Sequence, residues 1–171
     1  MKRDQMEHIL RAAAAITRER DFIVLGSQAL LAAVPELPPT LNQSMEIDLY
    51  PAGNPAAADL IDGSIGELSP FHERFGYYAH GVGPETAILP RNWRSRVLEV
   101  TNSNTGQARA LCISPVDLAI SKLIAGRVKD LDFVGAMLQL GLIDRKAILV
   151  VLDELDESFQ ATVRKRLNAY L

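Results

Sequence analysis

The chain has 171 residues, of which 48% are hydrophobic and 23% are charged, and its formal net charge is −3 at pH 7. This composition is ordinary for a globular protein and argues against disorder over most of the length. No apolar run reaches the roughly eighteen residues of a membrane span, and no hydrophobic segment follows the charged start of the chain. We therefore expect no membrane partner, no signal peptide and a cytoplasmic location. The single cysteine excludes an internal disulfide and a cysteine-based zinc site.

The first part of the chain predicts alternating helices and strands. Residues 4–19 carry apolar side chains at helical spacing, and residues 22–25 form a short, wholly apolar strand of the kind buried on both faces. Ser27 is a good helix N-cap, so a short helix is expected over 28–34. Residues 45–49 are then expected as the second strand.

The middle of the chain predicts broken helix, turns and a hairpin. Residues 55–75 are expected to be helical with a break at one of their glycines, and 76–92 should hold strand fragments and turns. Residues 96–100 and 108–113 read as paired strands around the turn at Asn102–Gly106.

From Ser114 onwards the pattern is helical. Ser114 caps a helix that has Pro115 at its first position. Three further helices are expected, over 130–140, 144–155 and 157–171. We therefore predict an α+β fold, a mixed sheet flanked by helices. Its core of residues 1–113 is followed by a helical region, residues 114–171, packed on the core as one compact unit.

Two motifs in the first part suit a phosphate and a metal ion. Gly26–Ser27 follows a strand, and its backbone could approach a phosphate closely while Ser27 adds a hydroxyl; the alternative is a simple turn. Glu46 and Asp48 alternate with Ile47, so both acids project from one face of a strand. Paired carboxylates are typical ligands of a hard divalent cation, and the alternative is an exposed strand edge that carries acids.

A third motif supplies positive charge. Lys122 and Lys129 are seven residues apart and would share one stripe of a continuous helix unless Gly126 interrupts it. Cationic groups here could contact triphosphate oxygens. The alternative is surface charge with local ion pairs such as Arg127–Asp130.

The three motifs in this order resemble the nucleotidyltransferase fold of the DNA polymerase beta superfamily. The resemblance rests on Gly26-Ser27, Glu46-x-Asp48 and the segment Pro115-x-Asp117-Leu118 to Asp132, and it covers roughly residues 20–135. Within the superfamily the chain is most similar to the minimal branch that includes the abortive-infection nucleotidyltransferase toxins.

That resemblance implies a reaction and a set of roles. Members transfer a nucleoside monophosphate from an NTP to a hydroxyl, and pyrophosphate leaves. The implied catalytic residues are Asp48, Lys122 and Asp130. The implied nucleotide-binding residues are Gly26, Ser27, Lys122 and Arg127, and the implied Mg²⁺ ligands are Glu46 and Asp48.

The resemblance leaves several functions open. The acceptor would be RNA, protein or a small molecule, and a toxin–antitoxin context would add tRNA or an antitoxin-like protein as partner. The alternative is a catalytically degenerate binding module that engages a protein. Glu46 favours this alternative because the superfamily usually has aspartate there, and Glu99 is the one strand candidate for a third acid. A homo-oligomeric structural protein built on the C-terminal helices is a third interpretation.

The remaining polar clusters favour structural roles. Two basic clusters are expected to be solvated surface rather than nucleic-acid patches: Arg91, Arg94 and Arg96, and Arg164, Lys165 and Arg166. Trp93 could stack on a base but more simply anchors a hairpin. His72 and His80 are not expected to form a metal site.

Overall fold

A five-stranded mixed sheet forms the centre of the computed structural model, which describes residues 1–170. The strands are β1 (Asp21–Val24), β2 (Glu46–Pro51), β3 (Tyr78–Gly81), β4 (Leu98–Val100) and β5 (Arg109–Cys112). They lie in the order β3-β2-β1-β5-β4, with β1–β5 and β2–β3 parallel and β1–β2 and β4–β5 antiparallel. The predicted α+β fold with a mixed sheet is confirmed.

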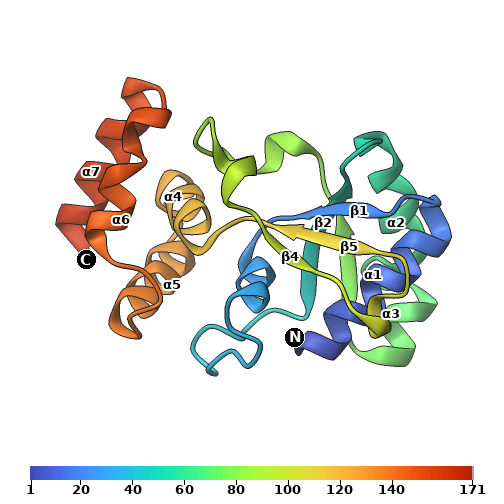
Figure 1. Ribbon diagram of the computed structural model, residues 1–171. Helices are drawn as coiled ribbons and strands as arrows, with labels where there is room; N and C mark the ends of the chain where they lie inside the picture. Colours follow the sequence, from blue (N-terminus) through green and yellow to red (C-terminus); the bar gives the residue numbers. More distant parts are fainter. Residues whose placement is uncertain (171) are drawn as a thin grey trace.

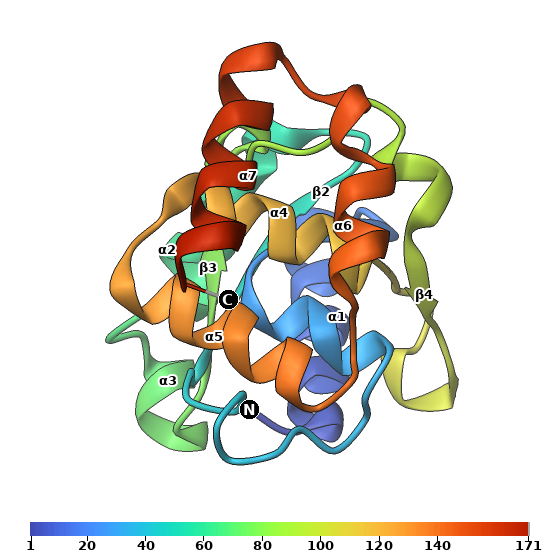
Figure 2. The same ribbon diagram turned by 90° about the vertical axis from the view of Figure 1, so that its left-hand side faces the viewer.

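The helices fall into two groups on the two sides of the view in Figure 1. The first group is α1 (Arg3–Thr17), α2 (Ala58–Ile65) and α3 (Pro70–Phe75). The second is α4 (Pro115–Ala125), α5 (Val128–Gln139), α6 (Arg145–Val150) and α7 (Glu157–Tyr170). These helices lie beyond the end of β5 (Figure 1), and α5, α6 and α7 all pack on α4 (Figure 2). The predicted C-terminal helical region is therefore confirmed, whereas its separation from the core at residue 113 stays a prediction. No helix within residues 1–170 has the length and apolar character needed to cross a membrane.

Helix α2 packs on one face of β2 and β3, and polar residues lie on the other face of these two strands. Gly81 lies opposite Leu49 in the register, and a Cβ added to Gly81 would stand 2.1 Å from the carbonyl oxygen of Ala58. Since residues paired across two strands share a face, Leu49 and Gly81 point towards α2. Residues one position away, Asp48 and His80, point to the opposite face.

One local prediction is wrong, and one open alternative is decided. Ser27 does not cap a helix, because Gly26 takes the cap position with φ +62° and ψ −169°, and Ser27 is already the first residue of a 3₁₀-helix, Ser27–Ala32. Gly126 does interrupt the helix, so Lys122 and Lys129 do not share one stripe of it. Gly126 ends α4 in a left-handed conformation with φ +68°, and α5 starts in a new direction.

The basic cluster around Arg96 is not a free surface. The Nη2 of Arg96 donates to Asp117 Oδ1 at 2.7 Å, and the Nη1 of Arg96 donates to Glu154 Oε1 at 2.9 Å. Arg96 lies in a 3₁₀-helix, Trp93–Arg96, so the predicted strand begins two residues later, at Leu98. The Asp117 side chain is completely buried. Arg96 therefore ties the segment before β4 to α4 and to the residues that precede α7.

Replacing Arg96 with alanine should destabilise the protein by roughly 3–5 kcal/mol, because it leaves the buried Asp117 carboxylate without its cation. Urea denaturation followed by circular dichroism measures the free energy of unfolding. The matched control is Arg109→Ala, which breaks a pair with Asp21 whose side chains are 41% and 40% exposed. That control should cost far less, because an exposed ion pair is screened by water. Equal costs for the two variants would contradict the structural role of Arg96.

Candidate active site

Two acids on β2 each face an aromatic or imidazole ring on β3. The parallel register sets Tyr78 opposite Glu46 and His80 opposite Asp48. The Tyr78 hydroxyl donates to Glu46 Oε2 at 2.9 Å, and His80 Nδ1 lies 2.9 Å from Asp48 Oδ1. Glu46 and Asp48 therefore lie on one face of β2, as predicted. Each acid interacts with the side chain opposite it on β3.

The surroundings of Asp48 disfavour its negatively charged form. Burial raises the pKa of Asp48 above its usual range, and the negative charge of Glu46 adds to this effect. The hydrogen bond with His80 and the charge of Lys122 act in the opposite direction but do not cancel it. Burial and the hydrogen bond to Glu46 raise the pKa of Tyr78 to about 12, so Tyr78 remains a donor to Glu46 at neutral pH. A cation between the acids would relieve their repulsion.

Gly26 lies directly against Asp48. A Cβ added to Gly26 would stand 2.2 Å from Asp48 Oδ2, and the N–H of Leu25 donates to the carbonyl of Asp48 at 2.9 Å. The φ and ψ of Gly26 also fall in a region that is essentially restricted to glycine. The structure thus brings the Gly26–Ser27 turn to the acid pair, and the role of the Ser27 hydroxyl stays a prediction.

Two cations converge on a buried carboxylate at the junction of α4 and α5. Lys122 Nζ lies 3.1 Å from Asp130 Oδ1 and 4.5 Å from the centre of the Phe133 ring. Arg127 Nε lies 2.6 Å from Asp130 Oδ2. The Asp130 side chain is 1% exposed, whereas Arg127 is 65% exposed. Burial raises the pKa of Asp48, and the charge of Lys122 makes a smaller contribution that lowers it. The hydrogen bond with Asp130 raises the pKa of Arg127, and the charge of Asp48 adds to this. Both cations therefore lie near enough to interact with the charge of Asp48.

Asp130 is suited to hold these cations rather than to accept a proton. Burial by itself would raise its pKa, but the hydrogen bonds from Arg127 and Lys122 outweigh burial and lower it. A carboxylate with a lowered pKa and no exposed surface is a poor base. Its contribution is therefore to position Lys122 and Arg127. The alternative of a purely local Arg127–Asp130 surface pair is incomplete, because Lys122 joins the same carboxylate from α4.

Other sequence candidates lie away from this cluster. Glu99 is on β4, separated from β2 by β1 and β5, and it pairs with Arg109 at 3.4 Å. It is therefore not a third acid beside Glu46 and Asp48. Within residues 1–170 no group of three or more histidine, cysteine, aspartate or glutamate side chains is arranged to hold a metal ion. Lys129 is exposed at the start of α5.

Sequence reasoning missed Tyr78 and His80 as members of the site. The alternation Tyr78-x-His80 repeats that of Glu46-x-Asp48, and this was the available signal. It acquires meaning only once β3 is known to pair with β2 in this register, which no local pattern reveals.

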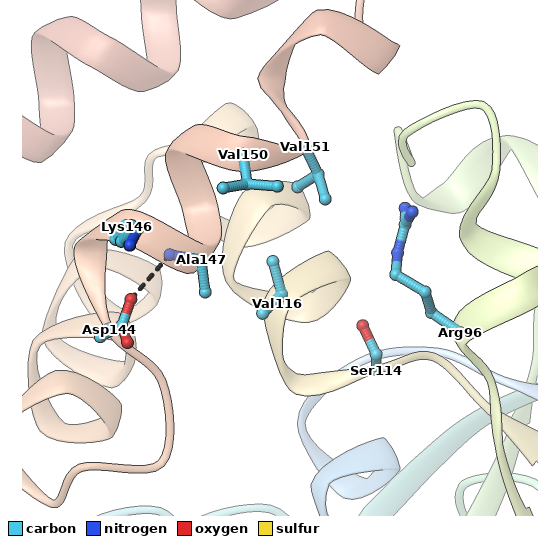
Figure 3. A pocket seen from close by; sticks show the side chains of 8 residues that line it. All are labelled: Arg96, Ser114, Val116, Asp144, Lys146, Ala147, Val150 and Val151. Carbon is cyan, nitrogen blue, oxygen red and sulfur yellow. Dashed lines mark hydrogen bonds between the residues drawn. The ribbon is translucent and has the colours of Figure 1, made fainter.

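A cavity of about 620 Å³ lies elsewhere, between the start of α4, α6 and Arg96 (Figure 3). Its walls are mainly apolar and include Val116, Ala147, Val150 and Val151. The polar groups at one end are already engaged, because Arg96 and Ser114 both donate to Asp117. Asp144 and Lys146 also line the cavity, and none of its lining residues belongs to the acid pair or to its neighbours on β3.

Comparison with known proteins assigns the family. Residues 4–169 match the model of the family described as "Nucleotidyltransferase of unknown function (DUF6036)". The chain belongs to this family, and the match extends over both the sheet and the C-terminal helices. No curated protein and no solved structure gave a match.

Gly26→Ala should destabilise the protein by about 1–3 kcal/mol through backbone strain and by a further amount through displacement of Asp48. Chemical denaturation measures the loss. The control is Gly76→Ala, where φ is +74° but an added Cβ meets nothing within 4 Å. We expect about 1 kcal/mol for the control. A Gly26 variant no less stable than the control would show that the contact with Asp48 is unimportant.

Asp48→Asn should raise the melting temperature at neutral pH. Because the native pKa is raised from the ordinary 3.8, ionising Asp48 costs stability. That cost accumulates as pH rises from the unfolded pKa through the folded pKa, and it is absent below both. The gain of the variant should therefore be largest near pH 7 and vanish near about pH 3. Thermal denaturation across this range tests the sign, with the exposed Asp132→Asn as control; a variant less stable than wild type at neutral pH would contradict it.

Proposed function

We propose that this chain transfers a nucleoside monophosphate from an NTP to a hydroxyl acceptor, with release of pyrophosphate. The observation that carries the proposal is the acid pair Glu46 and Asp48 beside the Gly26 turn, with Lys122 and Arg127 near enough for their charges to act on Asp48. Membership of a nucleotidyltransferase family supports the same reaction class.

The acid pair fits a magnesium ion. No side chain of residues 1–169 donates a hydrogen bond to Asp48 Oδ2 or Glu46 Oε1, so each acid keeps one oxygen for a ligand. Mg²⁺ is commonly bound through one or two carboxylates, with substrate phosphates and water completing its shell, so a third acid is not required. Bound there, the ion would neutralise charge on the phosphates during transfer.

The other residues of the site have complementary roles in this proposal. Lys122 and Arg127 bind triphosphate oxygens, for which the exposed, forked guanidinium of Arg127 is well suited. Asp130 orients both cations. Gly26 allows the backbone at the start of the 3₁₀-helix to approach a phosphate, and Ser27 adds its hydroxyl.

The acceptor and the biological setting rest on the resemblance to the toxin branch of the DNA polymerase beta superfamily. We propose a hydroxyl of RNA, including tRNA, of a protein or of a small molecule, in the cytoplasm. A toxin–antitoxin context would make an antitoxin-like protein the partner.

The second candidate is a degenerate member of the family that binds a protein partner without catalysis. The position opposite Asp48 on β3 is occupied by His80 rather than by a further acid, which favours this candidate. It predicts stable association with a partner and no affinity for NTP.

Transfer of label from α-³²P-labelled NTPs in the presence of Mg²⁺ tests the proposal with RNA, protein and small-molecule acceptors. Asp48→Ala should reduce transfer to background. Lys122→Ala should reduce it by about 10²–10³-fold, because a cation that stabilises the transferred phosphate is lost. The matched controls are Lys129→Ala and Glu99→Gln, which change an exposed cation and an acid remote from the site and should leave transfer unchanged.

The result that would overturn the proposal is the absence of both transfer and a Mg²⁺-dependent thermal shift with any NTP. Co-purification of a partner without NTP affinity would then favour the binding module. Loss of transfer in the control variants would show that the site lies elsewhere.

A further inference from the structure

Arg166 on α7 reaches the turn between α4 and α5 from the outer side. Its Nη1 donates to the carbonyl oxygens of Leu123 and Ile124, the latter at 2.7 Å. Figure 2 shows α7 lying alongside α4. The expectation that Arg164, Lys165 and Arg166 form one solvated cluster is therefore wrong for Arg166, which points inwards.

These bonds satisfy groups that a helix end normally leaves unpaired. The last carbonyls of a helix lack intrahelical donors, and they form the negative end of the helix dipole. At the end of α4 the N–H of Gly126 donates to the backbone carbonyl oxygen of Lys122 at 2.9 Å. The guanidinium of Arg166 donates to the next two carbonyl oxygens, those of Leu123 and Ile124. A cation in this position both completes the hydrogen bonds and balances the dipole.

Gly126 and Arg166 are complementary in shape as well. A Cβ added to Gly126 would stand 2.1 Å from Arg166 Cζ, so the guanidinium occupies the space that any side chain at position 126 would need. The φ of +68° at Gly126 independently favours glycine. Arg166 therefore covers the bend itself and not merely the end of α4.

The bend that Arg166 covers carries the cationic half of the site. Lys122 lies four residues before Gly126 and Arg127 one residue after it, and both reach Asp130. Only Gly126 separates the end of α4 from Arg127, so the distance between the two cations depends on the geometry of this turn. A residue that fixes the turn also fixes the positions of Lys122 and Arg127.

We propose that Arg166 is a positioning residue that holds the α4–α5 turn so that Lys122 and Arg127 converge on Asp130. The contribution of this geometry to NTP use rests on the proposed function. The contribution to the turn itself does not, and the two can be measured separately.

The test compares Arg166→Ala with Arg164→Ala, a matched change of an exposed arginine on the same helix. Carboxyl ¹³C NMR titration of Asp130 reports whether its two cations stay in place without any nucleotide. In Arg166→Ala the pKa of Asp130 should rise towards its ordinary value, and kcat/KM for NTP should fall by about 10- to 100-fold, as expected of a misplaced site. Added guanidinium should restore part of both, and Arg164→Ala should change neither.

Arg166→Lys keeps a charge but not the forked donor, and we expect it to fall between wild type and Arg166→Ala. It also provides the decisive comparison if Arg166→Ala does not fold. An Asp130 titration that is unchanged in these variants, even with a lower melting temperature, would overturn the proposal. If the wild-type protein shows no transfer, the proposed function fails, while the Asp130 titration still decides the role of Arg166.

Discussion

The buried carboxylate of Asp130 is the interaction on which the rest of the site depends. A carboxylate with 1% exposure is stable only with partners, and Lys122 on α4 and Arg127 in the turn before α5 supply them. The need to pair this one charge brings two long cationic side chains to one place. Their position relative to Asp48 is thereby determined before any ligand arrives, which lowers the entropic cost of binding one.

Asp130 also determines the charge balance of the site. Burial alone would raise the pKa of Asp130, but the hydrogen bonds from Arg127 and Lys122 lower it, so this carboxylate takes up part of the charge of both cations. The pKa of Asp48 stays raised, chiefly because Asp48 is buried and also because Glu46 is negatively charged. A free triphosphate would add negative charge to a site that already has more acids than bases. Under the proposed function a nucleotide is therefore favoured when it brings its own divalent cation, which neutralises phosphates and acids together.

Local chemistry was sufficient to predict much of the fold. The alternation of Glu46 and Asp48 and the Ser114 cap are properties of adjacent residues, and both appear as predicted. The failures concern distant partners. At Gly26 there is no room for a side chain, because Asp48, twenty-two residues later in the sequence, lies against it. Tyr78 and His80 belong to the site only because β3 pairs with β2. Glu99, the strand candidate for a third acid, lies away from the acid pair, because strand order and not strand propensity decides which acids are neighbours.

Helix α4 is held at both ends by arginines from outside it, and this links the C-terminal helices to the site. At its first turn Asp117 is paired with Arg96, from the segment before β4, and Arg96 also binds Glu154 ahead of α7. At its last turn Arg166 binds the carbonyls of Leu123 and Ile124. Lys122 lies between these two attachments, so the position from which it reaches Asp130 depends on both. The helices after α4 are accordingly part of the apparatus that positions the cations, which agrees with a family match that continues to residue 169.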